Sequence, residues 1–98
     1  MPDLIESKQI RSLNKFHYGD IVFLTASILE AIPRINERDE EVYVWVPSGQ
    51  YVVGNWAKIN GIDVRLLGLR YEDKGRALMN WYSVPPETDV YLLQESWQ

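Results

Sequence analysis

The stretch that decides the fold runs Glu41-Val42-Tyr43-Val44-Trp45-Val46, turns at Pro47-Ser48-Gly49-Gln50 and returns as Tyr51-Val52-Val53-Gly54-Asn55-Trp56-Ala57-Lys58-Ile59. β-Branched and aromatic residues alternate along its first arm, as they do along a strand with two distinct faces. Asn60-Gly61 follows. This pair is a strong hairpin signal because both central residues of a type I′ turn need a positive φ. The stretch therefore predicts consecutive antiparallel strands joined by tight turns.

Further strands are expected on both sides of this stretch. An apolar run follows Gly19-Asp20, and a tight turn at 73–75 ends in glycine. Pro85-Pro86 ends the strand expected over residues 76–84. A polar connection over 34–41 separates the first strand from the second. The expected strands cover residues 21–25, 41–46, 51–59, 62–71, 76–84 and 88–93.

The N-terminal residues carry a helix signal. Asp3 stands three residues before Glu6, which is the spacing of a capping box. Apolar residues follow at Ile5, Ile10, Leu13 and Phe16. We therefore expect a helix over residues 4–15.

Strands that follow one another without long helices between them favour an antiparallel meander over a parallel sheet. The expected fold is mainly β, or α+β at most: five to six strands curled into a small barrel, with the N-terminal helix beside it. In outline this order resembles SH3-type barrels with one extra strand. An OB-like barrel, the small oligonucleotide-binding type, is the competing topology.

Hairpin arithmetic assigns the side chains to two faces. A loop at Ser48-Gly49 would place Trp45 opposite Val52, and a loop at Asn60-Gly61 places Trp56 opposite Arg65. The apolar face would then hold Val42, Val44, Val46, Tyr51, Val53, Ala57, Ile59, Ile62, Val64 and Leu66. The second, mixed face would hold Tyr43, Trp45, Val52, Trp56, Lys58, Asp63, Arg65, Leu67 and Leu69.

Composition sets limits on the class of protein. With 98 residues, 46% of them hydrophobic and 12% aromatic, the chain is expected to form one domain over residues 1–98. It contains no cysteine, which excludes disulfide scaffolds, cysteine-based zinc sites and thiol nucleophiles. Neither a signal-peptide pattern nor a long apolar run is evident, so a cytoplasmic protein without a membrane partner is expected.

The net charge of −4 disfavours a protein that binds duplex DNA by neutralising phosphates. It favours basic partners and solubility. Residues 37–41 form an acidic cluster, Glu37-Arg38-Asp39-Glu40-Glu41, which is expected to be a solvated loop.

Catalytic chemistry has little support in the sequence. His17 is the only histidine, and Asp20 stands three residues later. An imidazole oriented by a carboxylate is half of a catalytic arrangement, but no nucleophile accompanies the pair. We therefore expect no catalytic residue, no metal site and no cofactor, and a small enzyme is the least favoured reading.

The candidate binding residues are those of the mixed face and the last tryptophan. They are Tyr43, Trp45, Trp56, Lys58, Arg65 and Trp97. Aromatic side chains with basic neighbours can anchor a peptide or stack on single-stranded bases. Two alternatives stay open: the N-terminal helix covers this face, or a partner does. For Trp97 two placements are equally expected: packed against the end of the barrel, or exposed for contact with a partner.

The favoured function is a non-catalytic protein–protein interaction module, such as an adaptor, an assembly subunit or a small inhibitor of a larger complex. It would use the aromatic face and the acidic surface, and its partner would be another protein or a second copy of the chain. The alternative is a small barrel that binds single-stranded nucleic acid on the aromatic platform, although the net charge disfavours it.

Overall fold

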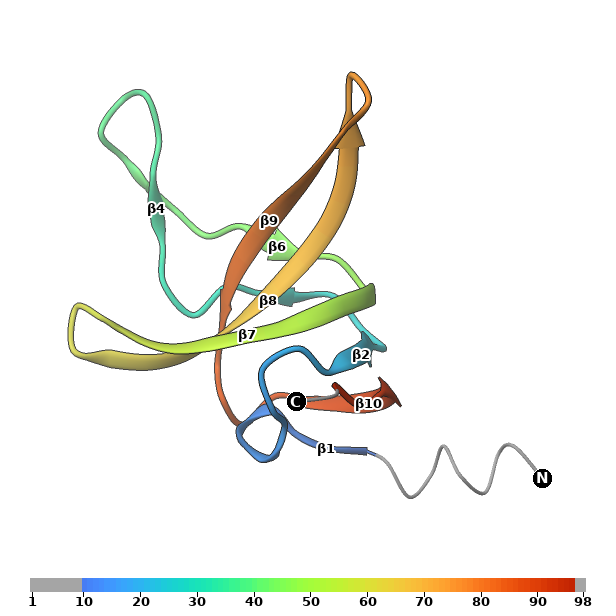
Figure 1. Cartoon of the computed structure of the whole chain (residues 1–98). Helices are drawn as coiled ribbons and strands as arrows, with labels where there is room; N and C mark the ends of the chain where they lie inside the picture. The colour runs from blue at the N-terminus through green and yellow to red at the C-terminus, as the bar shows by residue number, and fades with distance from the viewer. Residues whose placement is uncertain (1–9, 97–98) are drawn as a thin grey trace.

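The computed structural model describes residues 10–96, and this part of the chain is built almost entirely of antiparallel strands (Figure 1). The single helical element between residues 10 and 96 is a 3₁₀ turn, η1 (Leu13–Lys15). The strands are β1 (Ile10–Ser12), β2 (Ile21–Leu24), β3 (Ile28–Leu29), β4 (Arg34–Ile35), β5 (Glu41–Val42), β6 (Trp45–Val46), β7 (Gly49–Ile59), β8 (Ile62–Asp73), β9 (Arg76–Val84) and β10 (Asp89–Gln94). The prediction of a mainly β, antiparallel chain is confirmed.

The principal sheet has six strands in the order β1-β10-β2-β7-β8-β9. Two short pairs, β3 with β6 and β4 with β5, lie outside it. Within the described residues β1 and β9 are the two edges of the sheet, and no ladder joins them to each other. The sheet is therefore not closed into a barrel by strand pairing.

The Asn60-Gly61 hairpin has the register that the sequence predicts. Trp56 lies opposite Arg65, Ala57 opposite Val64 and Lys58 opposite Asp63. Both turn residues have positive φ, 52° for Asn60 and 80° for Gly61, as a type I′ turn requires.

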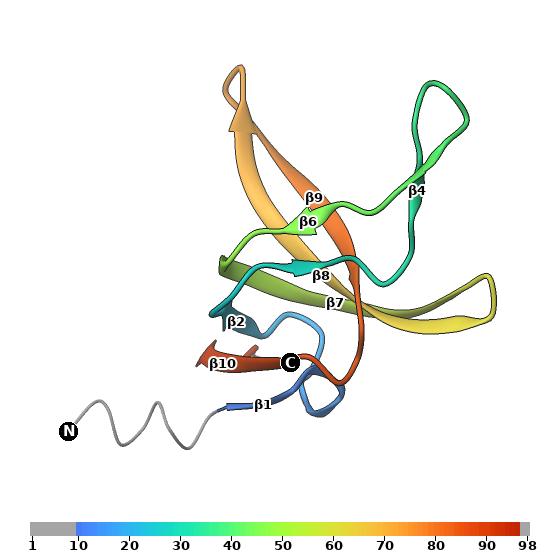
Figure 2. The same ribbon diagram turned by 180° about the vertical axis from the view of Figure 1, so that it is seen from behind.

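The hairpin predicted at Ser48-Gly49 is wrong. β7 uses that edge to pair with β2, so that Tyr51 lies opposite Val22. Residues 41–46 fold back instead on residues 28–35, and Trp45 lies opposite Leu29 rather than Val52. The expected polar connection and the strand after it thus form one long hairpin, residues 28–46, which we call the β3–β6 hairpin. It projects from the sheet (Figure 2).

The predicted N-terminal helix is wrong where the structure describes it; residues 4–9 of that prediction lie outside the described residues. Residues 10–12 pair with β10 as strand β1, and residues 13–15 form the 3₁₀ turn. Leu13 and Phe16 are both buried, and their spacing of three suits a 3₁₀ turn. The amide of Leu13 donates to the carbonyl of Thr88 at 2.8 Å, so partners outside the turn satisfy this backbone.

A bulge in β7 changes which residues of β8 face the core. The register shifts between Val53 and Trp56, so that Val53 lies opposite Leu67. Leu67 is therefore buried beside Val53, whereas Leu66, predicted for the apolar face, is half-buried. Because side chains alternate along a strand, Arg65 shares the face of Leu67 and enters the interior.

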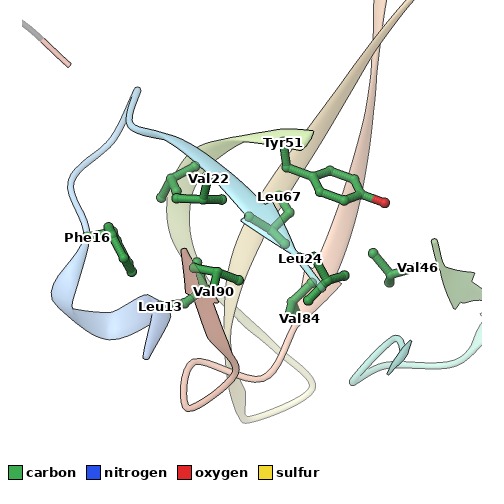
Figure 3. Close-up of a cluster of buried hydrophobic side chains, with 10 residues drawn as sticks. Leu13, Phe16, Val22, Leu24, Val46, Tyr51, Leu67, Val84 and Val90 are labelled. Carbon is green, nitrogen blue, oxygen red and sulfur yellow. The ribbon is translucent and has the colours of Figure 1, made fainter. Parts of the chain in front are cut away.

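The core is formed by buried side chains from β2, β7, β8, β9 and β10, together with side chains from the N-terminal turn and β6 (Figure 3). Its largest side chain is Tyr51, whose ring meets that of Tyr82 edge to face at 6.0 Å between centroids. The hydroxyl of Tyr51 donates to the carbonyl of Pro47, at the end of the β3–β6 hairpin. The remaining members of the cluster are Leu13, Phe16, Val22, Leu24, Val46, Val53, Leu67, Val84 and Val90.

Tyr51 gives the protein a defined response to alkaline pH. Burial, and to a smaller extent Tyr82, raises the pKa of Tyr51 to about 12. An unfolded tyrosine has a pKa of about 10, so the unfolded state releases this proton first. The contribution of Tyr51 to stability is complete below pH ~10 and is lost as the pH rises toward 12. Replacing Tyr51 with Phe should flatten this decline in the free energy of unfolding.

The measurement is urea unfolding from pH 7 to pH 11. At pH 7, Tyr51→Phe should lower the free energy of unfolding by about 1 kcal/mol through loss of the hydrogen bond. Tyr18→Phe, at an exposed tyrosine, is the matched control and should retain the alkaline decline. An unchanged decline in Tyr51→Phe would show that Tyr51 does not cause it.

Candidate interaction surface

Trp45 is the most exposed tryptophan in the described part of the chain, and it lies on a short strand paired with β3. Its neighbour Val46 is completely buried, whereas Trp45 on the opposite face of β6 is 61% exposed. Leu29 lies opposite Trp45 on β3 and is also exposed. Tyr43, which precedes β6, is 56% exposed. The β3–β6 hairpin thus carries aromatic and aliphatic side chains that face solvent.

Trp56 lies on β7, above a buried cation. Trp56 is 51% exposed, and the guanidinium carbon of Arg65 lies 4.8 Å from the centroid of its ring. Arg65 itself is only 2% exposed. Its Nε donates to the carbonyl of Gly54 at 2.9 Å, and its Nη1 donates to the carbonyls of Phe16 at 2.9 Å and Leu13 at 3.2 Å. Arg65 is therefore a structural cation rather than part of an exposed basic rim.

Burial lowers the pKa of Arg65, and the negative charge of Asp20 acts in the opposite direction. An arginine keeps its charge at any physiological pH, so the interior contains a permanent cation. Three carbonyl acceptors and one aromatic face surround this cation.

Lys58 extends from β7 on the same face as Trp56. Its Nζ lies 3.2 Å from the Oδ1 of Asp63, and both side chains are exposed. Such an exposed pair contributes little to stability. Lys58 is thus accessible, but a nearby carboxylate accompanies its charge.

The structure brings together only some of the predicted binding residues. Trp56, Lys58 and Arg65 belong to one hairpin, as the register predicts. Tyr43 and Trp45 belong to the β3–β6 hairpin, because the strand pairing predicted at Ser48-Gly49 does not form. Trp97 lies outside the described residues.

In the His17–Asp20 pair, the carboxylate of Asp20 accepts hydrogen bonds from the backbone. The Oδ2 of Asp20 accepts the main-chain amide of His17 at 2.9 Å, and its Oδ1 accepts the amide of Ser96 at 2.8 Å. The carboxylate is buried and ties the segment after the N-terminal turn to Ser96, two residues beyond β10. A cavity of about 340 Å³ lies beside it, lined by Lys15 and Glu95 among others.

An ion pair that the sequence analysis missed fixes the base of the β3–β6 hairpin. Arg34 donates from Nε and Nη2 to the two carboxylate oxygens of Glu30, at 2.7 and 2.9 Å. The hydrogen bond with Glu30 raises the pKa of Arg34. Glu30 is buried and also accepts the amide of Ser83 on β9 at 2.9 Å. The only sequence signal is a four-residue spacing, which resembles a helical pair.

Two glycines inside strands, Gly54 on β7 and Gly68 on β8, accommodate a tryptophan. A Cβ on Gly54 would lie 2.6 Å from the ring of Trp81, and one on Gly68 would lie 2.7 Å from it. The indole of Trp81 therefore packs directly on the backbone of β7 and β8 and is still 40% exposed. The side chain of Met79 lies over Gly68 as well. Both residues come from β9, whose outer face was not among the predicted sites.

Comparison with known proteins finds no matching family model and no significant match among curated proteins or solved structures. Within residues 10–96, no helix is long and apolar enough to cross a membrane. The same residues contain no group of three or more His, Asp or Glu side chains arranged to hold a metal ion.

The role of Arg65 gives a direct prediction about stability. Arg65→Lys keeps the charge, but an ammonium group cannot reproduce the planar fork that reaches three carbonyls. We expect the free energy of unfolding in urea to fall by about 2–4 kcal/mol, because buried acceptors lose their donors.

Arg70→Lys is the matched control. Arg70 is exposed on the same strand, so this variant should change the free energy of unfolding by less than about 0.5 kcal/mol. Equal, small effects for the two variants would contradict the structural role of Arg65.

Proposed function

We propose that the protein is a non-catalytic protein–protein interaction module: an adaptor, an assembly subunit or a small inhibitor of a larger complex. The observation that carries this proposal is the exposure of Trp45 on a strand anchored by buried Val46. A tryptophan side chain has only two rotatable bonds and so gives up little conformational entropy on binding, and tryptophan is enriched among the residues that dominate interface energies.

Other features of the β3–β6 hairpin support the same function. Ile35 and Tyr43 are exposed on it together with Trp45 and Leu29, and soluble monomers rarely leave extended apolar surface uncovered. Its tip carries the acidic cluster over residues 37–41, which favours a basic partner. Cytoplasmic residence and a second copy of the chain as partner remain parts of the proposal.

We infer an SH3-like arrangement in preference to an OB-like one. In an SH3-type barrel the first strand lies between the second and the last, and a long hairpin connects the first strand to the second. The order β10-β2-β7-β8-β9 and the β3–β6 hairpin between β2 and β7 support this inference. β1 would be the additional strand.

Single-stranded nucleic acid is the second candidate, and exposed Trp56 beside Lys58 is the feature that favours it. The burial of Arg65 removes one of its expected cations, and the net charge of −4 opposes it. Quenching of tryptophan fluorescence by single-stranded oligonucleotides at low salt would favour this candidate over the interaction module.

The interaction module is tested by capture on the immobilised full-length chain. We expect a partner to be retained from native extract, and Trp45→Ala to reduce the retained amount at least tenfold, because a central tryptophan contributes about 2 kcal/mol or more. Tyr18→Ala replaces an equally exposed aromatic residue outside the β3–β6 hairpin and should leave retention unchanged. Equal retention by wild type and Trp45→Ala, or a solitary monomer with no retained protein, would contradict the proposal.

A further inference from the structure

The outer edge of β9 presents backbone groups in a known alternation. The amide of Ser83 donates to Glu30, and its carbonyl accepts the amide of Ala31 at 2.8 Å, so both groups of Ser83 point away from β8. Along an antiparallel strand these directions repeat every second residue. The N–H and C=O groups of Trp81, Met79 and Ala77 therefore point outward as well, whereas Leu78 and Asn80 bond to β8.

The part of this edge beyond Trp81 has no neighbouring strand among the described residues. The Nη2 of Arg34 reaches the carbonyl of Trp81 at 3.4 Å, and the sheet ends at β9. On the other side, β7 pairs with β8 no further than Gly68. Residues 69–80 thus form a two-stranded ribbon that extends beyond the sheet (Figure 1). Such ribbons are marginally stable in water without a third strand.

The free segment of β9 lacks the features that usually protect an edge strand. Proline, charged residues and bulges commonly prevent pairing with another chain. Residues 77–81 read Ala77-Leu78-Met79-Asn80-Trp81, without a charge or a proline. Met79 and Trp81 are exposed on one face of the ribbon, and Tyr71 is exposed on the facing strand. This edge is suited to accept an extended segment.

The charge of the neighbouring hairpin indicates which segment fits. The β3–β6 hairpin meets β9 where Glu30 and Arg34 hold Trp81 and Ser83, and then diverges from it (Figures 1 and 2). Its tip is ordered: the Oδ1 of Asn36 accepts the amides of Arg38 and Glu40, both at 2.9 Å. The acidic residues of this tip and the adjoining strand are Glu37, Asp39, Glu40 and Glu41.

We propose that an extended segment of a partner protein adds to the free edge of β9 as an antiparallel strand, with apolar residues beside Ala77–Trp81 and basic residues that reach the acidic hairpin. This proposal rests on the proposed function and specifies the chemistry of its partner. A strand antiparallel to β9 has its N-terminal end near Trp81, so the basic residues precede the apolar ones. Past Trp81, the contacts of Arg34 and Ala31 direct the segment away from β9 and along the hairpin.

The probe is a synthetic peptide with the sequence Lys-Arg-Lys-Gly followed by Val-Thr-Val-Thr-Val. Titration into the ¹⁵N-labelled chain should give saturable binding, with a dissociation constant below about 1 mM. The largest shifts should fall on the amides of Ala77 and Met79, and affinity should decrease as salt is added. The peptide of reversed sequence should bind at least fivefold more weakly.

Met79→Pro tests the backbone contribution. The amide of Met79 points outward, so proline removes a donor to the partner and keeps the ladder to β8. We expect at least a tenfold loss of affinity, whereas Met79→Ala, which keeps the amide, should lose less than threefold. A peptide N-methylated at the central valine provides the same test with an unaltered protein and should also bind at least tenfold more weakly.

The inference is overturned if the probe does not bind, if Met79→Pro binds it equally well, or if the N-methylated peptide binds equally well. Self-association of the chain that is lost in Met79→Pro would overturn it in favour of a second copy on this edge. If Trp45→Ala abolishes partner capture and Met79→Pro does not, the proposed function stands and the inference about β9 falls.

Discussion

The buried guanidinium of Arg65 is the interaction on which the rest of the structure depends. Burying an isolated cation costs free energy. The carbonyl groups around Arg65 offset this cost because they take the place of water. Its hydrogen bonds connect three parts of the chain: the bulge in β7 at Gly54 and both ends of the N-terminal turn, at Leu13 and Phe16. One side chain thus fixes the path of β7 and seats the turn that buries Leu13.

The same network determines which aromatic residues face solvent. The bulge brings Arg65 inside, and Trp56 then lies over the cation with one face exposed. Buried Glu30 holds Arg34 and Ser83 together, so the β3–β6 hairpin leaves the sheet at a fixed point. In this protein, the exposed aromatic side chains lie on backbone that buried neighbours hold in place. This combination is what a binding surface requires, because little order has to be gained on association.

The sequence predicts features that depend on neighbouring residues and fails where distant segments compete. The Asn60-Gly61 turn and the register around it follow from local chemistry, since positive φ at both positions is encoded there. The strand over 42–46 reads equally well as a partner of 51–59. It pairs elsewhere because β2 occupies that edge of β7. The sequence pattern alone does not show that β2 and residues 42–46 compete for the same edge of β7.

The same limit explains why the sequence predicts the candidate site only in part. Exposed Trp45 and Trp56 were found from composition and alternation, but their common face depended on a pairing that does not form. The side chains of β7 that accompany Arg65 on its face depend on a single bulge, which inverts the alternation of faces along β7. The edge of β9 carries no motif, and only the order of the sheet shows that no other strand of residues 10–96 pairs with it.

The most direct test of the central role of Arg65 is the exchange rate of its Nε–H proton, measured by ¹H–¹⁵N NMR at neutral pH. A guanidinium enclosed by the carbonyls of Gly54 and Phe16 should exchange at least about 100-fold more slowly than that of exposed Arg70. Its proton signal should also be displaced by the ring of Trp56 and return toward the ordinary position in Trp56→Leu. An exchange rate equal to that of Arg70 would contradict a buried, carbonyl-solvated cation at the centre of this fold.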